Sequence, residues 1–325
     1  MSLSPSSHPG SYPAPSCAPR SLKRALLTSC CLAAVSGCGP EAVDTAPAVT
    51  PESQDAVSVR QAERTYNPGA GWTKVWGDEF NGNDLNSDNW NVVTSNFDGV
   101  TGNCNFGTGE LEYPRRANVS VGNGVLTLTA ERTNDNPMDS RCSGAGGRSF
   151  YSGRIHSKNK VERKFGKLVA SIKVPSGYGM WPAFWTMGAN VDSVGWPRCG
   201  EIDIQEWNST APNWMKSAVH YWDAPNGHEG DWGTGADDGG ALNDGDFHIY
   251  EVEWDASSIH FRVDGHAAND IFYHDQTELQ QQHYIILNLA VGGIWYGNPS
   301  PASVDLPAGT KRTLQVEWIR WFQKG

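Results

Sequence analysis

From residue 72 onward, the chain consists of short segments in which apolar and polar residues alternate, separated by clusters rich in Gly, Asn, Asp and Ser. Because successive side chains of a strand point to opposite faces of the sheet, this period of two predicts β-strands. Asp264 and Gly265 form a typical two-residue hairpin turn. No segment shows a convincing helical period with caps, so the sequence predicts an all-β antiparallel sandwich or barrel. The clearest strand segments are residues 124–130, 167–174, 249–254, 259–263, 284–290 and 314–322.

Residues 1–37 have the composition of an export signal. Lys23 and Arg24 precede a mostly apolar stretch, residues 25–35, which is well short of the ~20 residues that a membrane-spanning helix needs. Cys38 follows Val-Ser-Gly, which resembles the lipobox of bacterial lipoproteins, where the cysteine is lipidated. An ordinary cleaved signal peptide is the alternative. We therefore expect export, with the protein either lipid-anchored to the cell envelope or secreted.

Residues 38–66 are rich in Ala, Pro, Thr, Val, Glu and Gln and show no periodicity, as is typical of a flexible tether. Residues 67–325 then form the predicted folded domain. The whole chain has a formal charge of −11, and removal of residues 1–37 changes the balance to 22 − 36 = −14. No basic stripe accompanies this charge, which argues against nucleic acid and sulfated polyanions as partners. Nothing suggests more than a monomer.

Three cysteines remain in the predicted domain. Cys104 and Cys142 both lie in loop-like sequence rich in Gly, Asn and Ser, and export permits a disulfide between them. Cys199 would then be a free, buried thiol. It has no second cysteine at CxxC spacing and no histidine-rich neighbourhood, so it does not indicate a metal site.

The most informative segment for function is residues 200–206 (Gly-Glu-Ile-Asp-Ile-Gln-Glu). On a strand, Glu201 and Asp203 share one face and the two isoleucines share the other, apolar face. One inserted residue, a β-bulge, would reverse the alternation after Ile204 and bring Glu206 onto the face of the other two acids. Like charges packed together raise at least one carboxyl pKa, as a general acid requires.

Surface acids on a solvated edge strand are the simpler interpretation of this cluster, but the two isoleucines indicate a central strand. Clustered acids of this kind typically bind a metal or hydrolyse a glycoside. Aromatic residues favour the second chemistry. Trp181 and Trp185 share one strand face, and Trp196 lies five residues before Glu201. Flat indoles beside carboxylates are suited to binding and cleaving sugar chains.

The motif at 200–206 resembles the ExDxxE signature of glycoside hydrolase family 16, in its bulge-containing, laminarinase-like branch. Further segments resemble the same family in order along the chain. They are residues 77–82, 109–113, 181–185, 219–221, 288–293 and 316–320. The resemblance covers residues 72–323, almost the whole predicted domain.

This resemblance implies a β-jelly roll of two curved antiparallel sheets, whose concave side holds an open glycan cleft. It also implies retaining hydrolysis without a cofactor, with Glu201 as nucleophile, Glu206 as general acid/base and Asp203 tuning the nucleophile. His220 would lie near the acid/base, and the tryptophans at 181, 185 and 196 would form sugar platforms. The implied substrate is a polysaccharide, β-1,3-glucan of the laminarin type.

Many family members bind a structural calcium ion, and the resemblance places such a site at Glu79, Gly124 and Glu317. The first two would offer carbonyl oxygens, and Glu317 stands where the family has an aspartate. Thr108, Val169 and Ser171 also depart from the family pattern, and we expect them in or near the cleft.

Alternative activities on the same scaffold are hydrolysis of mixed-linkage β-1,3-1,4-glucan, or of a galactan such as agarose or carrageenan, and transglycosylation. A different class is a glycan-binding lipoprotein without turnover, although all three acids are intact. A calcium-binding structural sandwich would leave the tryptophans unexplained.

Overall fold

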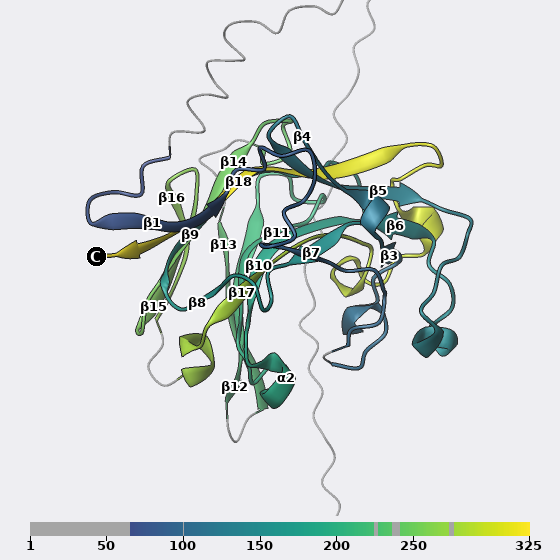
Figure 1. Cartoon of the computed structure of the whole chain (residues 1–325). Coiled ribbons are helices and arrows are strands. Elements are labelled where there is room, and N and C mark those ends of the chain that lie inside the picture. Colours follow the sequence, from purple (N-terminus) through teal and green to yellow (C-terminus); the bar gives the residue numbers. More distant parts are fainter. Residues whose placement is uncertain (1–65, 100, 224–226, 236–240, 273–275) are drawn as a thin grey trace, which may run out of the picture. The chain divides into compact units, whose positions relative to one another are not determined.

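The computed structural model describes residues 66–325, except for residues 100, 224–226, 236–240 and 273–275 (Figure 1). The predicted signal peptide (1–37), the lipidation candidate Cys38 and the predicted tether up to residue 65 lie outside the described residues. Tyr66, the last residue of the predicted tether, packs against the domain, with ring-centroid distances of 5.9 Å to Trp318 and 5.7 Å to Phe322. Among the described residues, no helix combines the length and apolarity required to span a membrane.

Two β-sheets face each other. The first, called the back sheet here, has the strand order β16-β15-β14-β9-β18-β5-β6-β3, with β1 paired to β18 and β4 paired to β5. Its pairs are antiparallel except β3 with β6. Its strands are β1 (Trp72–Asp78), β3 (Glu112–Pro114), β4 (Val119–Gly122), β5 (Val125–Arg132), β6 (Phe150–Ser152), β9 (Gly166–Lys173), β14 (His248–Trp254), β15 (Ser258–Val263), β16 (His266–Phe272) and β18 (Lys311–Lys324).

The second sheet, called the cleft sheet here, has the order β13-β12-β11-β10-β17-β7-β2, with β8 paired to β17. Its strands are β2 (Asn91–Val92), β7 (Arg154–His156), β8 (Glu162–Arg163), β10 (Met180–Gly188), β11 (Glu201–Trp207), β12 (Met215–Asp223), β13 (Gly227–Gly235) and β17 (His283–Val291). Short helices lie in the connections: η1 (Asn105–Gly107), η2 (Arg116–Asn118), η3 (Ser140–Ala145), α2 (Val191–Val194), η4 (Thr277–Gln280), η5 (Ile294–Tyr296) and η6 (Pro301–Ser303).

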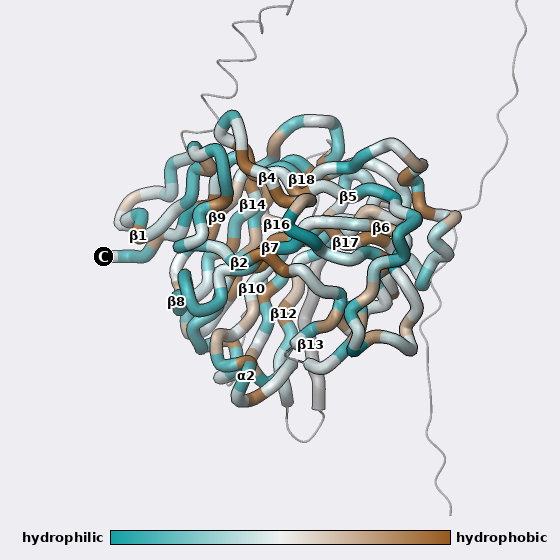
Figure 2. The backbone as a smooth tube through the Cα atoms, turned by 45° about the vertical axis from the view of Figure 1, so that its right-hand side comes forward, coloured by the Kyte–Doolittle hydropathy of each residue, from teal (hydrophilic) through white to brown (hydrophobic). Residues whose placement is uncertain are grey.

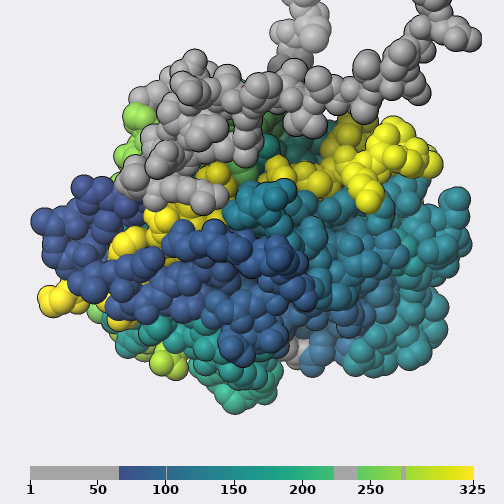
Figure 3. Space-filling view, turned by 45° about the horizontal axis from the view of Figure 1, so that its top comes forward, coloured from purple at the N-terminus to yellow at the C-terminus, as the bar shows by residue number. Residues whose placement is uncertain are grey.

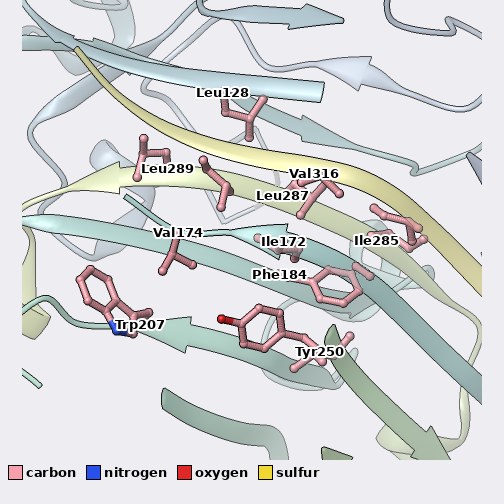
Figure 4. Close-up of a cluster of buried hydrophobic side chains, with 14 of the residues drawn as sticks. Leu128, Ile172, Val174, Phe184, Trp207, Tyr250, Ile285, Leu287, Leu289 and Val316 are labelled. Carbon is pink, nitrogen blue, oxygen red and sulfur yellow. The ribbon is translucent and has the colours of Figure 1, made fainter. Parts of the chain in front are cut away.

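The hydrophobic core lies between the sheets. Leu128 and Ile172 of the back sheet and Phe184 and Leu287 of the cleft sheet are fully buried and belong to one apolar cluster (Figure 4). The backbone coloured by hydropathy shows hydrophobic residues in strands of both sheets (Figure 2). The strands form where the sequence alternates because each presents one apolar face to this core. The predicted all-β jelly-roll sandwich is therefore confirmed.

Strand β18 has a central place in the back sheet. It pairs with β9 on one side and with β1 and β5 on the other, and it is 14 residues long. Segments from the two ends of the described chain consequently lie side by side (Figure 3). The six strand segments read from the sequence all correspond to observed strands. Asp264 and Gly265 join β15 to β16 with φ of 49° and 80°, as a type I′ hairpin turn requires.

The cysteines are paired as expected. Cys104 and Cys142 form a disulfide with a Cα–Cα distance of 5.5 Å, and Cys199 is a buried free thiol. The disulfide links the loop before η1 to η3. Both of these segments lie outside the two sheets, so the disulfide joins two connecting loops.

Candidate active site

The predicted β-bulge is present in β11. Asp203 pairs with Trp185 of β10 and Ala218 of β12, whereas Glu206 pairs with Ala183 and Lys216. Three steps along β11 thus match two steps on each neighbouring strand, so β11 contains one extra residue. Ile202, Ile204 and Trp207 remain buried in the core. The bulge therefore brings Glu206 onto the same face as Glu201 and Asp203, as the sequence predicts.

An open cavity of about 310 Å³ lies on this face. It is lined by Glu201, Asp203 and Glu206 together with Trp181, Trp185 and Trp196. The structure thus brings six of the seven predicted catalytic and substrate-binding residues to one cavity wall. The acids come from β11, two of the tryptophans come from the adjacent strand β10, and Trp196 comes from the segment that precedes β11.

Two of the tryptophans also donate hydrogen bonds to the carboxylates. Trp196 Nε1 donates to Glu201 Oε2 at 2.7 Å, and Trp181 Nε1 donates to Glu206 Oε1 at 3.1 Å. Trp185 Nε1 donates instead to Asn288 Oδ1 of β17 at 2.7 Å. Two of the indoles that we expected to serve as sugar platforms therefore each fix one glutamate as well, a role that sequence alternation does not reveal.

His220, the seventh residue, lies at a different place from the one expected. It pairs across the strands with Glu201, and its Nε2 is 3.3 Å from Asp203 Oδ2. We expected His220 near Glu206, but in the register of β12 on β11 the residue that pairs with Glu206 is Lys216. Lys216 Nζ is 3.6 Å from Glu206 Oε2. No sequence motif singled out Lys216, although it lies an even number of residues before His220 on β12 and therefore shares its face.

The acids are electrostatically coupled. Burial, and then the negative charge of Asp203, raise the pKa of Glu201 to about 8. Burial, and then the charge of Glu206, also raise the pKa of Asp203 well above its usual range. The hydrogen bond from Trp196 acts in the opposite direction on Glu201. The cluster therefore retains a proton at pH values where isolated carboxyls have lost theirs, and its titration belongs to the group as a whole.

Further polar residues line the cavity, among them Glu110, Arg154 and Asn288. The Arg154 guanidinium lies over Phe106 at 4.1 Å and near the Trp185 ring at 5.2 Å. No carboxylate of the described residues lies within ion-pairing distance of Arg154. The cleft thus contains a cation whose charge is not neutralised by a direct partner in the part of the chain that the structure describes.

The three departures from the family pattern have different locations. Thr108 lines the cavity, as expected, and its hydroxyl donates to Glu110 Oε1 at 2.6 Å. The expectation for Val169 and Ser171 is wrong, since both belong to β9 of the back sheet. Val169 packs beside Trp318 there. The sequence pattern identified β9 as a strand, but it did not indicate which sheet the strand would join.

The residues expected to bind calcium lie beside β18. Glu79 directly follows Asp78, which pairs with Ile319 of β18. Gly124 lies two residues before Leu126, which pairs with Val316 of β18. The two segments thus approach Glu317 from opposite directions along β18. The Glu317 side chain is buried and accepts a hydrogen bond from the Ser171 hydroxyl at 3.0 Å. Among the described residues, no lysine or arginine forms an ion pair with Glu317. A buried carboxylate is among the oxygen ligands that Ca²⁺ prefers.

A jelly roll with three carboxylates on one strand and indole donors around them defines the site of a glycoside hydrolase. A family model described as "Beta-porphyranase A-D, GH16 domain" matches residues 72–324. The chain belongs to glycoside hydrolase family 16.

Known proteins of this family resemble the chain over the same region. It is 30% identical over 267 residues to a glucan endo-1,3-beta-glucosidase of Cryptopygus antarcticus, which covers 77% of this chain and 91% of that protein. It is 29% identical over 278 residues to glucan endo-1,3-beta-glucosidase A1 of Niallia circulans, covering 78% of this chain but only 38% of that relative. The laminarinase catalytic domain of Thermotoga maritima superposes with a TM-score of 0.67 at 29% identity, covering 78% of this chain and 99% of that domain.

Proposed function

We propose that the protein is an exported endo-β-1,3-glucanase that cleaves laminarin-type glucan with retention of configuration. The observation that carries the proposal is the bulge of β11, which places Glu201 and Glu206 on one face of the cavity. Retaining hydrolysis needs two carboxyl groups on the same side of the sheet, flanking one glycosidic bond. Relatives that are named endo-1,3-beta-glucosidases support the choice of linkage.

In the proposed first step, Glu201 attacks the anomeric carbon, and a glycosyl-enzyme ester forms as the glycosidic bond breaks. Glu206 gives its proton to the departing oxygen and becomes a carboxylate. In the second step, Glu206 takes a proton from water while that water attacks the anomeric carbon and releases Glu201. Asp203, between the two glutamates, raises the pKa of Glu201 and thereby tunes the nucleophile.

The substrate is tested by measuring reducing-end release by the full chain on laminarin, lichenan, agarose and carrageenan. The Glu201→Gln variant serves as the blank. Release from laminarin that disappears in the variant is the expected result. A folded protein that binds laminarin without releasing reducing ends would instead be a glycan-binding protein.

The covalent intermediate has its own test. Glu201→Ala should lose turnover of an aryl β-glucoside oligomer, and added azide should restore it by forming an α-glycosyl azide. Azide would enter from the face that the missing carboxylate occupied. A product with the β configuration, or no rescue in a variant that still binds glucan, would contradict the nucleophile assignment.

A galactan is the second candidate substrate, and one observation favours it. The cation of Arg154 lies in the cleft between two aromatic rings without a direct carboxylate partner. Such a group can bind an acidic substituent on a sugar chain. The name of the matching family model, which refers to β-porphyranases, points in the same direction. Preferential release from the sulfated galactan carrageenan over the neutral glycans laminarin and agarose would favour this candidate.

Three further properties are proposed from the sequence. Cys38 is the lipid attachment site, which radiolabelled palmitate incorporation into the wild type but not into Cys38→Ser would support. The protein is a monomer, which light scattering can measure. Glu317 and the carbonyl groups of Glu79 and Gly124 hold calcium, so removal of calcium with a chelator should lower the melting temperature of the wild type more than that of Glu317→Gln.

A further inference from the structure

Lys216 lies directly opposite the proposed acid/base on the neighbouring strand. Glu206 of β11 and Lys216 of β12 are paired in register, and Lys216 Nζ is 3.6 Å from Glu206 Oε2. The Lys216 side chain is 27% exposed and that of Glu206 is 12% exposed. Lysine side chains on a free surface normally extend into water. Here the ammonium group is directed at a carboxylate that lines the cavity.

Aromatic rings complete the surroundings of this pair. The ammonium of Lys216 is 5.6 Å from the ring centroid of Trp295 in η5, and Trp295 packs edge-to-face on Trp181 at 5.2 Å. Trp181 in turn donates its indole hydrogen to Glu206 Oε1. The indole of Trp181 therefore donates a hydrogen bond to Oε1 of Glu206, and the ammonium of Lys216 lies within ion-pairing distance of Oε2. Trp295 contacts both Trp181 and Lys216.

We propose that Lys216 is a positioning residue that fixes the orientation of Glu206 and stabilises its carboxylate while the glycosyl-enzyme exists. This inference rests on the proposed function, because it requires Glu206 to cycle between acid and carboxylate. In the first step, Glu206 loses its proton to the departing sugar, and the adjacent ammonium favours the negative charge that results. In this role, Lys216 transfers no proton itself.

Other charged groups also face Glu206. Asp203 and Glu201 lie on its own strand, and His220 lies farther along β12. Glu110 and Asp98, from the loops that precede β3, and Arg154 of β7 line the same cavity. Within the described residues, Lys216 is the cation that forms an ion pair with Glu206. It therefore offsets the repulsion that the neighbouring acids exert on the ionised form.

The sign of the pH effect follows from this arrangement. The first step requires the protonated form of Glu206, and Lys216 favours the ionised form. The alkaline limb of the activity profile therefore lies at a lower pH with the ammonium present than it would without it. Removal of the charge should move the alkaline limb of the kcat/KM profile upward by about one pH unit, the lower end of the shift expected for a charge at this distance.

The experiment compares Lys216→Met with Lys216→Arg in the full chain. Lys311→Met is the matched control, because it removes a positive charge from the exposed end of β18, where Lys311 pairs with Glu131. kcat/KM is measured against pH on laminarin and on a dinitrophenyl β-laminaribioside, whose leaving group needs no proton. Thermal unfolding confirms that each variant is folded.

For Lys216→Met, we expect the upward shift of the alkaline limb and about a tenfold loss of kcat/KM on laminarin at the optimum. The loss on the dinitrophenyl substrate should be much smaller. Lys216→Arg and Lys311→Met should keep the wild-type profile. Equal losses on both substrates, or an unmoved alkaline limb, would overturn the role of Lys216 while leaving the glucanase proposal intact. A wild type that cleaves neither substrate would overturn the proposed function, and this inference with it.

Discussion

Replacement of Trp196 by phenylalanine should separate two functions of this residue. Phenylalanine keeps a flat apolar ring in the cleft, but it lacks the indole hydrogen that reaches Glu201 Oε2 at 2.7 Å. Hydrogen bonds to charged groups contribute about 1.5–3 kcal/mol. Trp196 is 39% exposed, so water can partly replace its hydrogen bond, and we expect a loss of about 1.4 kcal/mol, which corresponds to one pH unit.

The direction of the change is determined by the form of Glu201 that reacts. In the proposed mechanism Glu201 attacks as the ionised form, and the hydrogen bond from Trp196 favours this form against burial, which raises the pKa of Glu201 to about 8. Loss of the hydrogen bond raises this pKa further. The acid limb of the kcat/KM profile on laminarin should therefore move about one unit to higher pH, and activity well below the limb should fall about tenfold.

Trp185→Phe is the matched control for this experiment. Trp185 also lines the cavity, but its indole donates to Asn288 rather than to an acid. Trp185→Phe should alter the affinity for the glycan and leave the acid limb of the kcat/KM profile at its wild-type pH. An acid limb that is unmoved in Trp196→Phe, or one that moves equally in both variants, would refute the reasoning.

Three further predictions concern stability. Gly200 has φ of +79°, and a Cβ there would lie 2.4 Å from the Glu278 carbonyl oxygen, so Gly200→Ala should lower the free energy of unfolding by more than about 2 kcal/mol in urea denaturation. Replacing both Cys104 and Cys142 by serine should lower it by about 2–4 kcal/mol, and an unchanged denaturation midpoint would contradict a stabilising disulfide. Burial alone would lower the pKa of His248, but hydrogen bonds to its two aspartate partners raise it to about 9. Its contribution of about 1–2 kcal/mol should thus be complete below about pH 6.5 and be lost as pH rises through 9, and His248→Gln should remove this dependence from the unfolding curves.

The clustering of the three acids could be predicted because the information lies within one strand. Alternation places Glu201 and Asp203 together, and the apolar residues on the other face show that the strand is central. The bulge could be inferred because Glu206 would otherwise point into the core. These residues lie only a few positions apart, where the geometry of an extended chain is known in advance.

Relations between strands could not be predicted in the same way. His220 was expected beside Glu206, but the register of β12 on β11 places it opposite Glu201 and places Lys216 opposite Glu206. This register depends on the loop between β11 and β12, whose conformation alternation does not specify. Likewise, Val169 and Ser171 lie in a strand that was recognised correctly but belongs to the back sheet. Arg154 reaches the cleft through the pairing of β7 with β17, which joins segments far apart in sequence.

The position of β18 has a consequence for the timing of folding. Strands β10, β11 and β12 follow one another along the chain and can pair as soon as each is made, so the catalytic face is assembled from nearby segments. The back sheet differs, because β1, β5 and β9 all await Lys311–Lys324 as a pairing partner. Until residues 311–324 have left the ribosome, the nascent chain has unpaired strand edges at the centre of the back sheet. Truncation before residue 311 should therefore yield aggregates rather than a smaller active enzyme.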